Sequence, residues 1–523
     1  MPSPAVVIPP RRTLVLFAIL AIGMIGLSYV VIVLMAVACM FLPALLLYNI
    51  VNFNTLVLFL GGLVIAGIML WSLIPRRDHF EAPGLLLEPS VHPVLFTEIQ
   101  NIAAALKEPL PREVYLIGDA NAWVADRGGL LGIGSRRVMA LGLPLLAALN
   151  VSQFRAILAH EFAHYYGGDT GLGPWLHRTQ MAMIRTFQGI GSVGELQLPG
   201  VVAILYTVVF GILKGYWLVF LRAINFVSRR QEFRADELAC IVAGPGALTS
   251  GLRSVHASTL AWPAYWRNEL APMLGSGCLP SITGGFSQFL AAPSIAKEVE
   301  AGLQKEMEEG KTQPYDSHPP LRNRIEEAGR LQIASPPDDV RPAQCLLGDV
   351  GLAEQHFLEA MNPDLPKNGF RRVSWEESGP KFLIPSWSEA VTEYAQFLKG
   401  MTTANLANSL NRIPDIAAEM RSPKGMLLTP QQKIPYARHL VGTAFALALV
   451  HHGWKLHSSP GEFYLEKDGK QVGPFEVLQK LFNGTTPADA WIDVCREYGI
   501  EDLELVPSAD PVQQPVQSTS QSS

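Results

Sequence analysis

The sequence has few cysteines and little charge, and each scarcity excludes a class of protein. Its five cysteines in 523 residues are scattered and show no CxxC spacing, which argues against a cysteine metal site and favours a reducing compartment. Charged residues make up 17% of the chain, the net charge is −5, and no basic block stands out. Nucleic-acid binding is therefore not expected.

A nucleotide-binding loop is also not expected. The Gly-rich stretch GGLLGIG at residues 128–134 could be mistaken for a phosphate loop, but it lacks the Gly-Lys-Ser/Thr ending whose lysine reaches the phosphates. We interpret its glycines as turns that precede a strand at 137–143.

Apolar sequence, by contrast, is abundant. Apolar residues make up 49% of the chain, and the mean hydropathy of +0.21 is high for a wholly soluble protein. Two runs, Leu14–Leu47 and Thr55–Ile74, reach the roughly 20 residues that a bilayer requires. Neither run has the short apolar stretch and small-residue cleavage site of a signal peptide. We therefore expect residues 1–79 to form two transmembrane helices.

Arginine pairs lie at both outer ends of this hairpin. Arg11 and Arg12 precede the first run, Arg76 and Arg77 follow the second, and the connecting loop carries no charge. By the positive-inside tendency both ends face the cytoplasm, so the region that follows is expected there too.

Two of the 12 histidines lie in the sequence HEFAH at residues 160–164. Residues four apart share one face of a helix, so His160 and His164 can reach one metal ion with Glu161 beside it. Zinc binds neutral imidazole, and a catalytic zinc keeps one position for water, whose proton a neighbouring carboxylate can accept. Ser152 as N-cap and a stop at Gly167-Gly168 would delimit this helix.

Such a zinc enzyme needs a third protein ligand, and the best candidate is Glu232, with Asp236 one turn later in SRRQEFRADELA at residues 228–239. A glutamate can bind the ion while the second carboxylate orients a ligand histidine through its free ring N–H. Taken alone, such a charged stretch is also typical of a solvated helix face.

These two motifs, together with SHPPLRNR at residues 317–324, resemble the glutamate-zincin metalloproteases, and more narrowly the HtpX-like and CAAX-prenyl-protease-like membrane endopeptidases. The resemblance covers roughly residues 80–330. It implies the following roles: one Zn²⁺ per chain bound by His160, His164 and Glu232; Glu161 as general base; Asp236 as the orienting carboxylate; and His318 with Arg324 near the reacting carbonyl.

The resemblance implies a membrane-anchored zinc-dependent endopeptidase that cleaves protein or peptide substrates, with a role such as membrane-protein quality control. It implies the bacterial inner membrane, with the catalytic region in the cytoplasm. Substrate backbone would pair with an edge strand at Val138–Leu143, near Gly142. The prenyl-protease branch fits less well, because a two-span anchor cannot build a large chamber inside the membrane.

Two alternatives stay open. One is a membrane-anchored peptide-binding or chaperone-like protein with gated or little proteolytic activity, which the intact Glu161 disfavours. The other is a protease that residues 343–523 keep latent.

The expected fold is mainly α with a small β-sheet. An α+β zincin-like domain at residues 80–334, with a helix at Val91–Leu106 and a strand at Glu113–Ile117, follows the hairpin at 1–79. Residues 343–505 form an α+β accessory region and 507–523 a disordered tail. A hairpin with an Asp-Gly turn and a helix at 463–484 faintly resemble a GYF-type peptide-binding module, so this region could recruit protein partners.

An apolar segment between the first two motifs, Leu198–Val227, is long enough for a third span. Because His160, His164 and Glu232 must approach one ion, both ends of this segment lie on one side of the membrane. A helical hairpin would satisfy this, as would a second crossing at Leu172–Val193, although that stretch carries two arginines. The preferred expectation is a long amphipathic helix that packs on the catalytic core and dips into the membrane surface.

Overall fold

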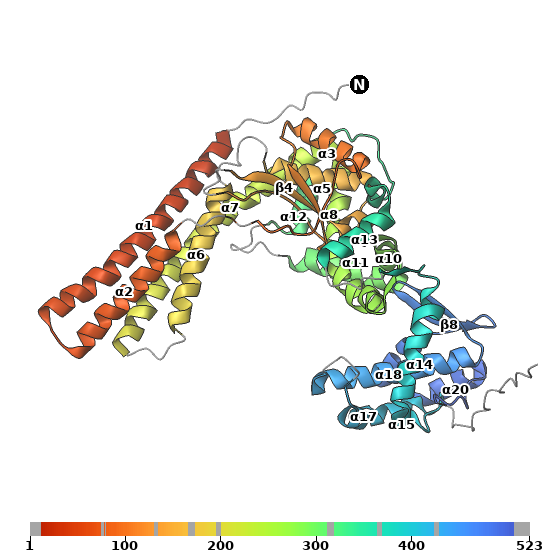
Figure 1. The fold of residues 1–523 in the computed structure, drawn as a ribbon. Coiled ribbons are helices and arrows are strands. Elements are labelled where there is room, and N and C mark those ends of the chain that lie inside the picture. The colour runs from red at the N-terminus through yellow and green to blue at the C-terminus, as the bar shows by residue number, and fades with distance from the viewer. Residues whose placement is uncertain are drawn as a thin grey trace, which may run out of the picture. The chain divides into compact units, whose positions relative to one another are not determined.

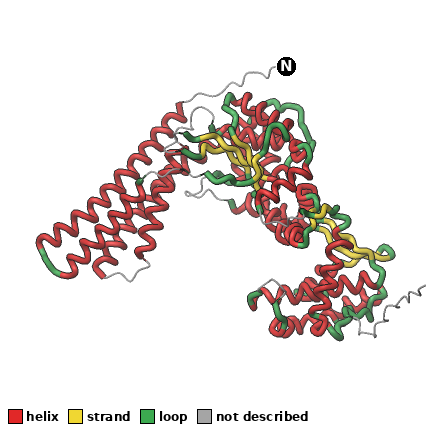
Figure 2. The backbone as a smooth tube through the Cα atoms, viewed as in Figure 1, coloured by secondary structure: helices red, strands yellow, loops and turns green. Residues whose placement is uncertain are grey.

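The computed structural model describes residues 12–74, 78, 80–129, 134–165, 173–194, 200–310, 318–362, 369–422 and 428–506. These residues are mainly helical, with three small sheets (Figures 1 and 2). The chain divides into two compact units, Met1–Pro263 with Lys297–Leu365 and Ala264–Ala296 with Pro366–Ser523. The second unit thus includes residues 264–296, which the sequence predicts as part of the protease domain.

Four helices of the first unit pack together as a bundle: α1 (Arg12–Asn49), α2 (Phe53–Leu73), α6 (Gly173–Gly194) and α7 (Gly200–Ala243) (Figure 1). All four supply its buried core, which consists of Ile32, Ala36, Cys39, Ile65, Ala66, Met69, Met183, Ile190, Val209 and Leu213. Within the described residues, three helices are long and apolar enough to cross a membrane, namely α1, α2 and α7. The two apolar helices expected before residue 79 are therefore confirmed.

The membrane orientation expected from the arginine pairs is not tested by the structure. Arg11, Arg76 and Arg77 lie outside the described residues. The cytoplasmic orientation therefore stays a prediction.

From residue 200 on, the segment Leu198–Val227 is helical, but its packing differs from the expected packing on the catalytic core. Its first part, in α7, contributes Val209 and Leu213 to the core of the bundle rather than to the catalytic core. Helix α6 packs on α2 and α7, so α6 and α7 together form a helical hairpin. One arginine of α6 is tolerated because a polar partner is near: Arg185 donates from Nη2 to the backbone oxygen of Ser72, at 3.0 Å.

The small sheet of the first unit has the strand order β1-β2-β4-β3. Its strands are β1 (Leu85–Leu86), β2 (Glu113–Ile117), β3 (Ala122–Arg127) and β4 (Arg136–Gly142). Strand β4 pairs in parallel with β2 and antiparallel with β3. The edge strand expected at Val138–Leu143 is therefore wrong, because the chain before the Gly-rich turn folds back as β3 and covers that edge.

The first unit also contains other helical elements, some of which pack on this sheet. They are α3 (Pro93–Leu106), α4 (Leu143–Ala148), α5 (Val151–Ala163), α8 (Pro245–Tyr265), α11 (Pro293–Glu309), α12 (Leu321–Gly329), the 3₁₀ helix η3 (Ala343–Leu347) and α13 (Val350–Met361). The helix expected from residue 91 to 106 and the strand expected at 113–117 are confirmed.

Helix α5 carries the HEFAH sequence, and its N-cap is Asn150 rather than Ser152. The Asn150 side chain accepts from the Gln153 amide at 2.8 Å, and the Gln153 side chain accepts in return from the Asn150 amide at 3.0 Å. This capping box satisfies two backbone donors at the helix start. Ser152 instead accepts from the Asp339 amide at 2.7 Å. The expected stop at Gly167-Gly168 lies outside the described residues.

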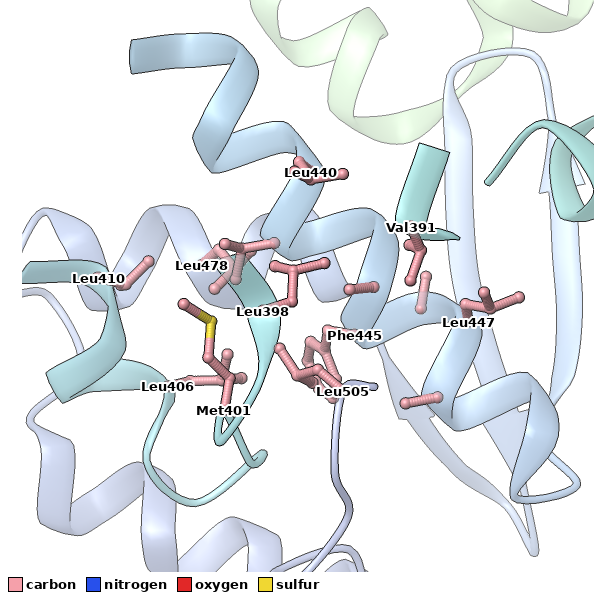
Figure 3. Close-up of a cluster of buried hydrophobic side chains, with 14 of the residues drawn as sticks. Val391, Leu398, Met401, Leu406, Leu410, Leu440, Phe445, Leu447, Leu478 and Leu505 are labelled. Carbon is pink, nitrogen blue, oxygen red and sulfur yellow. The ribbon is translucent and has the colours of Figure 1, made fainter. Parts of the chain in front are cut away.

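The second unit is built around α18 (Pro430–His451), whose side chains are almost all buried from Ala437 to Leu449 (Figure 3). Its other helices are η2 (Trp266–Leu270), α9 (Ala271–Gly275), α10 (Ile282–Ala291), η4 (Gly379–Leu383), α14 (Ile384–Glu393), α15 (Ala395–Leu398), α16 (Leu406–Ser409), η5 (Leu410–Arg412), α17 (Ile413–Glu419), α19 (Pro474–Phe482) and α20 (Ala488–Tyr498). The apolar side chains of α18 therefore form part of a globular core.

The second unit has two small sheets, with strands β5 (Cys278–Leu279), β6 (Arg371–Arg372), β7 (Lys455–Ser459), β8 (Glu462–Lys467) and β9 (Lys470–Val472). The hairpin expected from the Asp-Gly turn is present between β8 and β9. Asp468 and Gly469 there have φ values of 53° and 75°, which a two-residue hairpin turn of this type requires.

Helices α1 and α2 approach each other closely at Gly62. A Cβ atom at that position would lie 2.1 Å from the Cys39 carbonyl oxygen, and a backbone atom of a packed helix cannot move aside. We expect Gly62→Ala to destabilise the bundle by about 1–3 kcal/mol, as overpacking does. The thermal unfolding midpoint of the detergent-purified protein measures this loss. The matched control is Gly67→Ala, whose new Cβ would meet nothing within 4 Å; equal losses would contradict the prediction.

Glu269 is a partly buried carboxyl group of the second unit that accepts from the Gly461 amide at 3.4 Å. Burial raises the pKa of Glu269. A carboxyl group whose pKa is raised by folding favours the folded state only while protonated, and this contribution is lost as the pH rises through the folded-state pKa. Glu269→Gln keeps an acceptor for Gly461 and removes the charge. We therefore expect this variant to be more stable than wild type at pH 8 and little changed at pH 4.

Hydrogen exchange of peptides that contain Gly461 measures the difference in stability of the second unit between Glu269→Gln and wild type at each pH. The exposed Glu419 provides the control, because Glu419→Gln removes the same charge from the surface. A gain of the same size at both pH values would show that burial of the charge is not its cause.

Candidate metal centre

Three side chains from two helices converge on one point. Helix α5 supplies His160 and His164 from successive turns, and α7, which packs along α5, supplies Glu232. The two Nε2 atoms lie 3.2 Å apart, and each lies 3.5 Å from a carboxylate oxygen of Glu232. Ligand atoms about 2.0–2.1 Å from a tetrahedral zinc ion lie roughly 3.3 Å from one another. The three side chains therefore have the spacing of a zinc ligand set.

The state of the Glu232 carboxylate supports this interpretation. Its side chain is 3% exposed, and its Oε2 atom is buried without a hydrogen-bond partner. A buried carboxylate oxygen without a hydrogen bond is costly unless a cation lies against it, and the Arg324 Nη1 atom, 3.6 Å away, is too far to donate one. Two imidazoles and one carboxylate form a donor set that suits zinc. The residues present thus fit the metal.

Asp236 and Arg324 hold His160 in place. Asp236 Oδ1 lies 2.9 Å from His160 Nδ1, which leaves the Nε2 atom of His160 for the cluster. Arg324, on α12, donates to both Asp236 oxygens, from Nε at 2.8 Å and from Nη2 at 2.6 Å. Such a bidentate pair fixes the carboxylate and, through it, the imidazole ring. The expected proximity of Arg324 to a reacting carbonyl stays a prediction.

His318 lies on the open side of the cluster. Its Nδ1 atom is 3.0 Å from Glu232 Oε1, and its side chain is 69% exposed whereas Glu232 is buried. The hydrogen bond with Glu232 raises the pKa of His318. The structure therefore brings the third motif to the ligands of the first two. Ser317 lies outside the described residues.

Burial shifts the pKa values of Glu161 and His164, two residues of the HEFAH sequence, in opposite directions. It raises the pKa of Glu161 to about 7, and a carboxyl group with such a pKa can both accept and release a proton near neutral pH. Burial also lowers the pKa of His164 to about 4, which keeps this imidazole neutral, as a metal ligand must be.

His160 behaves differently from His164. Burial and the Arg324 charge lower its pKa, but hydrogen bonds with Asp236 and Glu232 outweigh both and raise the pKa to about 9. Because only a neutral imidazole binds a metal ion, metal binding at this site competes with a proton on His160.

Two features beside the cluster, the strand β3 and Tyr165, were not predicted from the sequence. Tyr165 directly follows His164, and its hydroxyl donates to the Val124 oxygen of β3 at 2.8 Å. The Arg137 guanidinium lies over its ring, 4.1 Å from the centroid. The end of α5 is thus tied to the edge strand. The position of Ala122–Arg127 before a Gly-rich turn and a second strand is the hairpin signal that could have revealed β3.

The buried pair between Arg324 and Asp236 leads to a stability prediction. A lysine cannot reproduce the two parallel hydrogen bonds. We expect Arg324→Lys to lower the unfolding midpoint of the chelator-treated protein by an amount that corresponds to roughly 1–3 kcal/mol. Arg322 on the same helix is the control: it is exposed and 3.7 Å from Glu326, so Arg322→Lys should cost less than about 0.5 kcal/mol. Equal effects would contradict the role of the buried pair.

Comparisons with known proteins agree with this site. Residues 89–332 match the model of peptidase family M48. The chain is 28% identical over 137 residues to "Protease HtpX" of Acinetobacter baumannii (strain AYE), which is 23% of this chain and 43% of that protein. It is 25% identical over 183 residues to "Protease HtpX homolog 2" of Methanosarcina mazei, which is 34% of this chain and 60% of that protein. The chain thus spans about half the length of these curated relatives. No solved structure matches the chain.

Proposed function

Because residues 89–332 are a domain of peptidase family M48 and resemble HtpX proteases, we propose that this protein is a membrane-anchored, zinc-dependent endopeptidase. The observation that carries the proposal is the convergence of His160, His164 and Glu232 at zinc-ligand spacing, with an acid–base residue, Glu161, between the two histidines. The substrates are proteins or peptides.

The chemistry that a zinc ion supplies in such a site is a water activated near neutral pH and a polarised substrate carbonyl. Glu161 accepts the proton of the attacking water and then donates it to the leaving amine. Its pKa of about 7 suits both steps. Asp236 and Arg324 keep the His160 ring in one orientation throughout.

His318 is placed to stabilise the negative charge that develops on the carbonyl oxygen. It is the exposed member of the cluster, and its raised pKa favours the protonated, cationic form. A preorganised donor aimed at an oxyanion contributes on the order of 3 kcal/mol to the rate. Arg324 acts behind the ligands, through Asp236.

Substrate binding belongs at β3 rather than at β4 and Gly142. In the small sheet, β3 has a partner on one side only, and an extended peptide can add to such an edge as a further strand. Tyr165 ties β3 to the end of α5, which places a peptide on this strand close to the two histidines.

The helix α7 sets the height of the site above the membrane. At 1.5 Å per residue, Glu232 lies about 48 Å along the helix from Gly200, whereas the hydrocarbon core is about 30 Å thick. We propose that α7, which is long and apolar enough to span, crosses the bilayer from its first residue. The site then lies within about 20 Å of the membrane surface. This proximity favours membrane proteins as substrates. We place the site in the cytoplasm, at a bacterial inner membrane.

Zinc content and proteolysis test the proposal together. Detergent-purified wild-type protein should contain one zinc per chain and cleave casein, and a chelator should abolish cleavage. Glu161→Gln should keep the zinc and lose at least about a hundredfold in rate, since general acid–base catalysis contributes this much. Glu232→Ala should lose the zinc.

Glu237→Gln is the matched control, because Glu237 lies on the same helix and pairs with Arg234 instead of the cluster. It should keep both zinc and activity. Zinc retained in Glu232→Ala would refute the ligand set. Full zinc without cleavage in the wild type would favour the peptide-binding alternative, or latency imposed by residues 343–523.

A further inference from the structure

One face of α7 is exposed along most of its length. The side chains on this face are apolar in the first part of the helix and include arginines further along. Its first part presents apolar side chains that are between 50% and 67% exposed, namely Ile204, Val208, Ile212 and Val219. The same face continues with Arg222, Phe226 and Arg230. Successive members of this series are three, four or seven residues apart, the spacing that keeps side chains on one face of a helix.

The basic end of this face carries uncompensated charge. From Leu196 to Gln231 the sequence has four basic residues and no acidic residue. Arg222 and Arg230 are both exposed, and neither forms an ion pair within the described part of the chain. The Arg230 guanidinium lies over the Phe226 ring, 5.8 Å from its centroid, and Phe226 is itself 43% exposed.

The point along α7 at which basic side chains replace apolar ones matches the boundary of a bilayer. Measured from Gly200 at 1.5 Å per residue, Arg222 lies about 33 Å and Arg230 about 45 Å along the helix. The hydrocarbon core is about 30 Å thick, and the headgroup layers extend the bilayer to about 40–45 Å. Arg222 therefore lies where the acyl chains end, and Arg230 lies at the outer side of the headgroups. Aromatic and basic residues are both enriched at this level.

We propose that Arg222 and Arg230, with Phe226 between them, bind the headgroups of anionic phospholipids in the leaflet next to the metal site. Guanidinium groups match phosphate in charge and in bidentate geometry, and basic residues just outside a membrane helix attract anionic lipids. The inference rests on the membrane crossing that we propose for α7, but it does not depend on proteolysis.

Such a lipid site would act on the same helix that holds the metal ligand. Arg230 is two residues before Glu232, on the exposed face, whereas Glu232 and Asp236 are buried on the face toward α5. Headgroups bound at Arg222 and Arg230 would therefore fix the height of α7 in the bilayer. Through α7, they would fix the distance between the site and the membrane surface.

Native mass spectrometry of the detergent-purified full chain tests the proposal directly. The protein is titrated with dioleoyl phosphatidylglycerol and, separately, with zwitterionic dioleoyl phosphatidylcholine. We expect wild type to bind the anionic lipid more tightly. The double variant R222Q/R230Q should bind it about 30-fold more weakly, since each basic residue near a membrane surface contributes about fivefold. Binding of the zwitterionic lipid should not change.

Two further variants make the result decisive. R222K/R230K keeps both charges and should retain most of the anionic-lipid binding, which separates the effect of charge from a disturbed helix. R112Q/R412Q removes two exposed arginines elsewhere and should bind the anionic lipid like wild type. Equal affinity of wild type for the two lipids, or equal affinities of R222Q/R230Q and R112Q/R412Q for the anionic lipid, would overturn the proposal.

The E161Q background distinguishes this proposal from the proposed protease function. Lipid binding should be the same in E161Q and wild type, with or without a chelator. A protein that binds the anionic lipid but does not cleave casein would count against an active protease and leave the lipid site in place. A protein that cleaves casein but has no preference for the anionic lipid would refute the lipid site and support the protease.

Discussion

The contact between α5 and α7 is the constraint on which the rest of the structure depends. Two histidines at the end of one helix and a glutamate in the last third of another must hold their nitrogen and oxygen atoms 3.2–3.5 Å apart. Helix α7 also belongs to the apolar bundle, so the chain between the two motifs has to leave the site and return to it. The hairpin of α6 and α7 provides this return path.

The charges around the cluster form one connected network centred on Glu232 and Asp236. Glu232 contacts both histidines of α5, His318 and Arg324, while Asp236 joins His160 to Arg324. Two buried carboxylates so close together would repel each other without Arg324 between them. Removal of one member of such a network leaves the others buried without a partner, which is why the three motifs are interdependent.

Local features of the site could be predicted from the sequence, because they depend on helix geometry alone. The i, i+4 spacing placed His160 with His164 and Glu232 with Asp236, and the structure brings these four side chains together. Features set by long-range pairing could not be predicted. The parallel pairing of β2 with β4, which puts β3 at the edge, joins segments separated by a turn and a hairpin strand. Asn150 and Ser152 are both good caps by residue type, and the capping box of Asn150 with Gln153 selects Asn150, while Ser152 accepts from the Asp339 amide instead.

The boundary between the two units also depends on long-range contacts that the sequence does not reveal. Residues 264–296 belong to the second unit because Tyr265 is fully buried there against Phe286 and Trp375, and no local pattern indicates that contact. Likewise, α6 looked too polar to join an apolar bundle. The structure accommodates it through pairs such as Ser72 and Thr186, whose hydroxyl oxygens are 2.5 Å apart.

The central claim is that two imidazoles and one carboxylate bind a single zinc ion. X-ray absorption spectroscopy of the zinc-loaded Glu161→Gln protein tests it most directly, because it reads the type and distance of the ligand atoms and needs no substrate. The account predicts a first shell of about four nitrogen and oxygen atoms at roughly 2.0–2.1 Å, with the scattering pattern of two imidazole rings. A sulfur shell near 2.3 Å, or a shell of oxygen atoms without imidazole scattering, would contradict it.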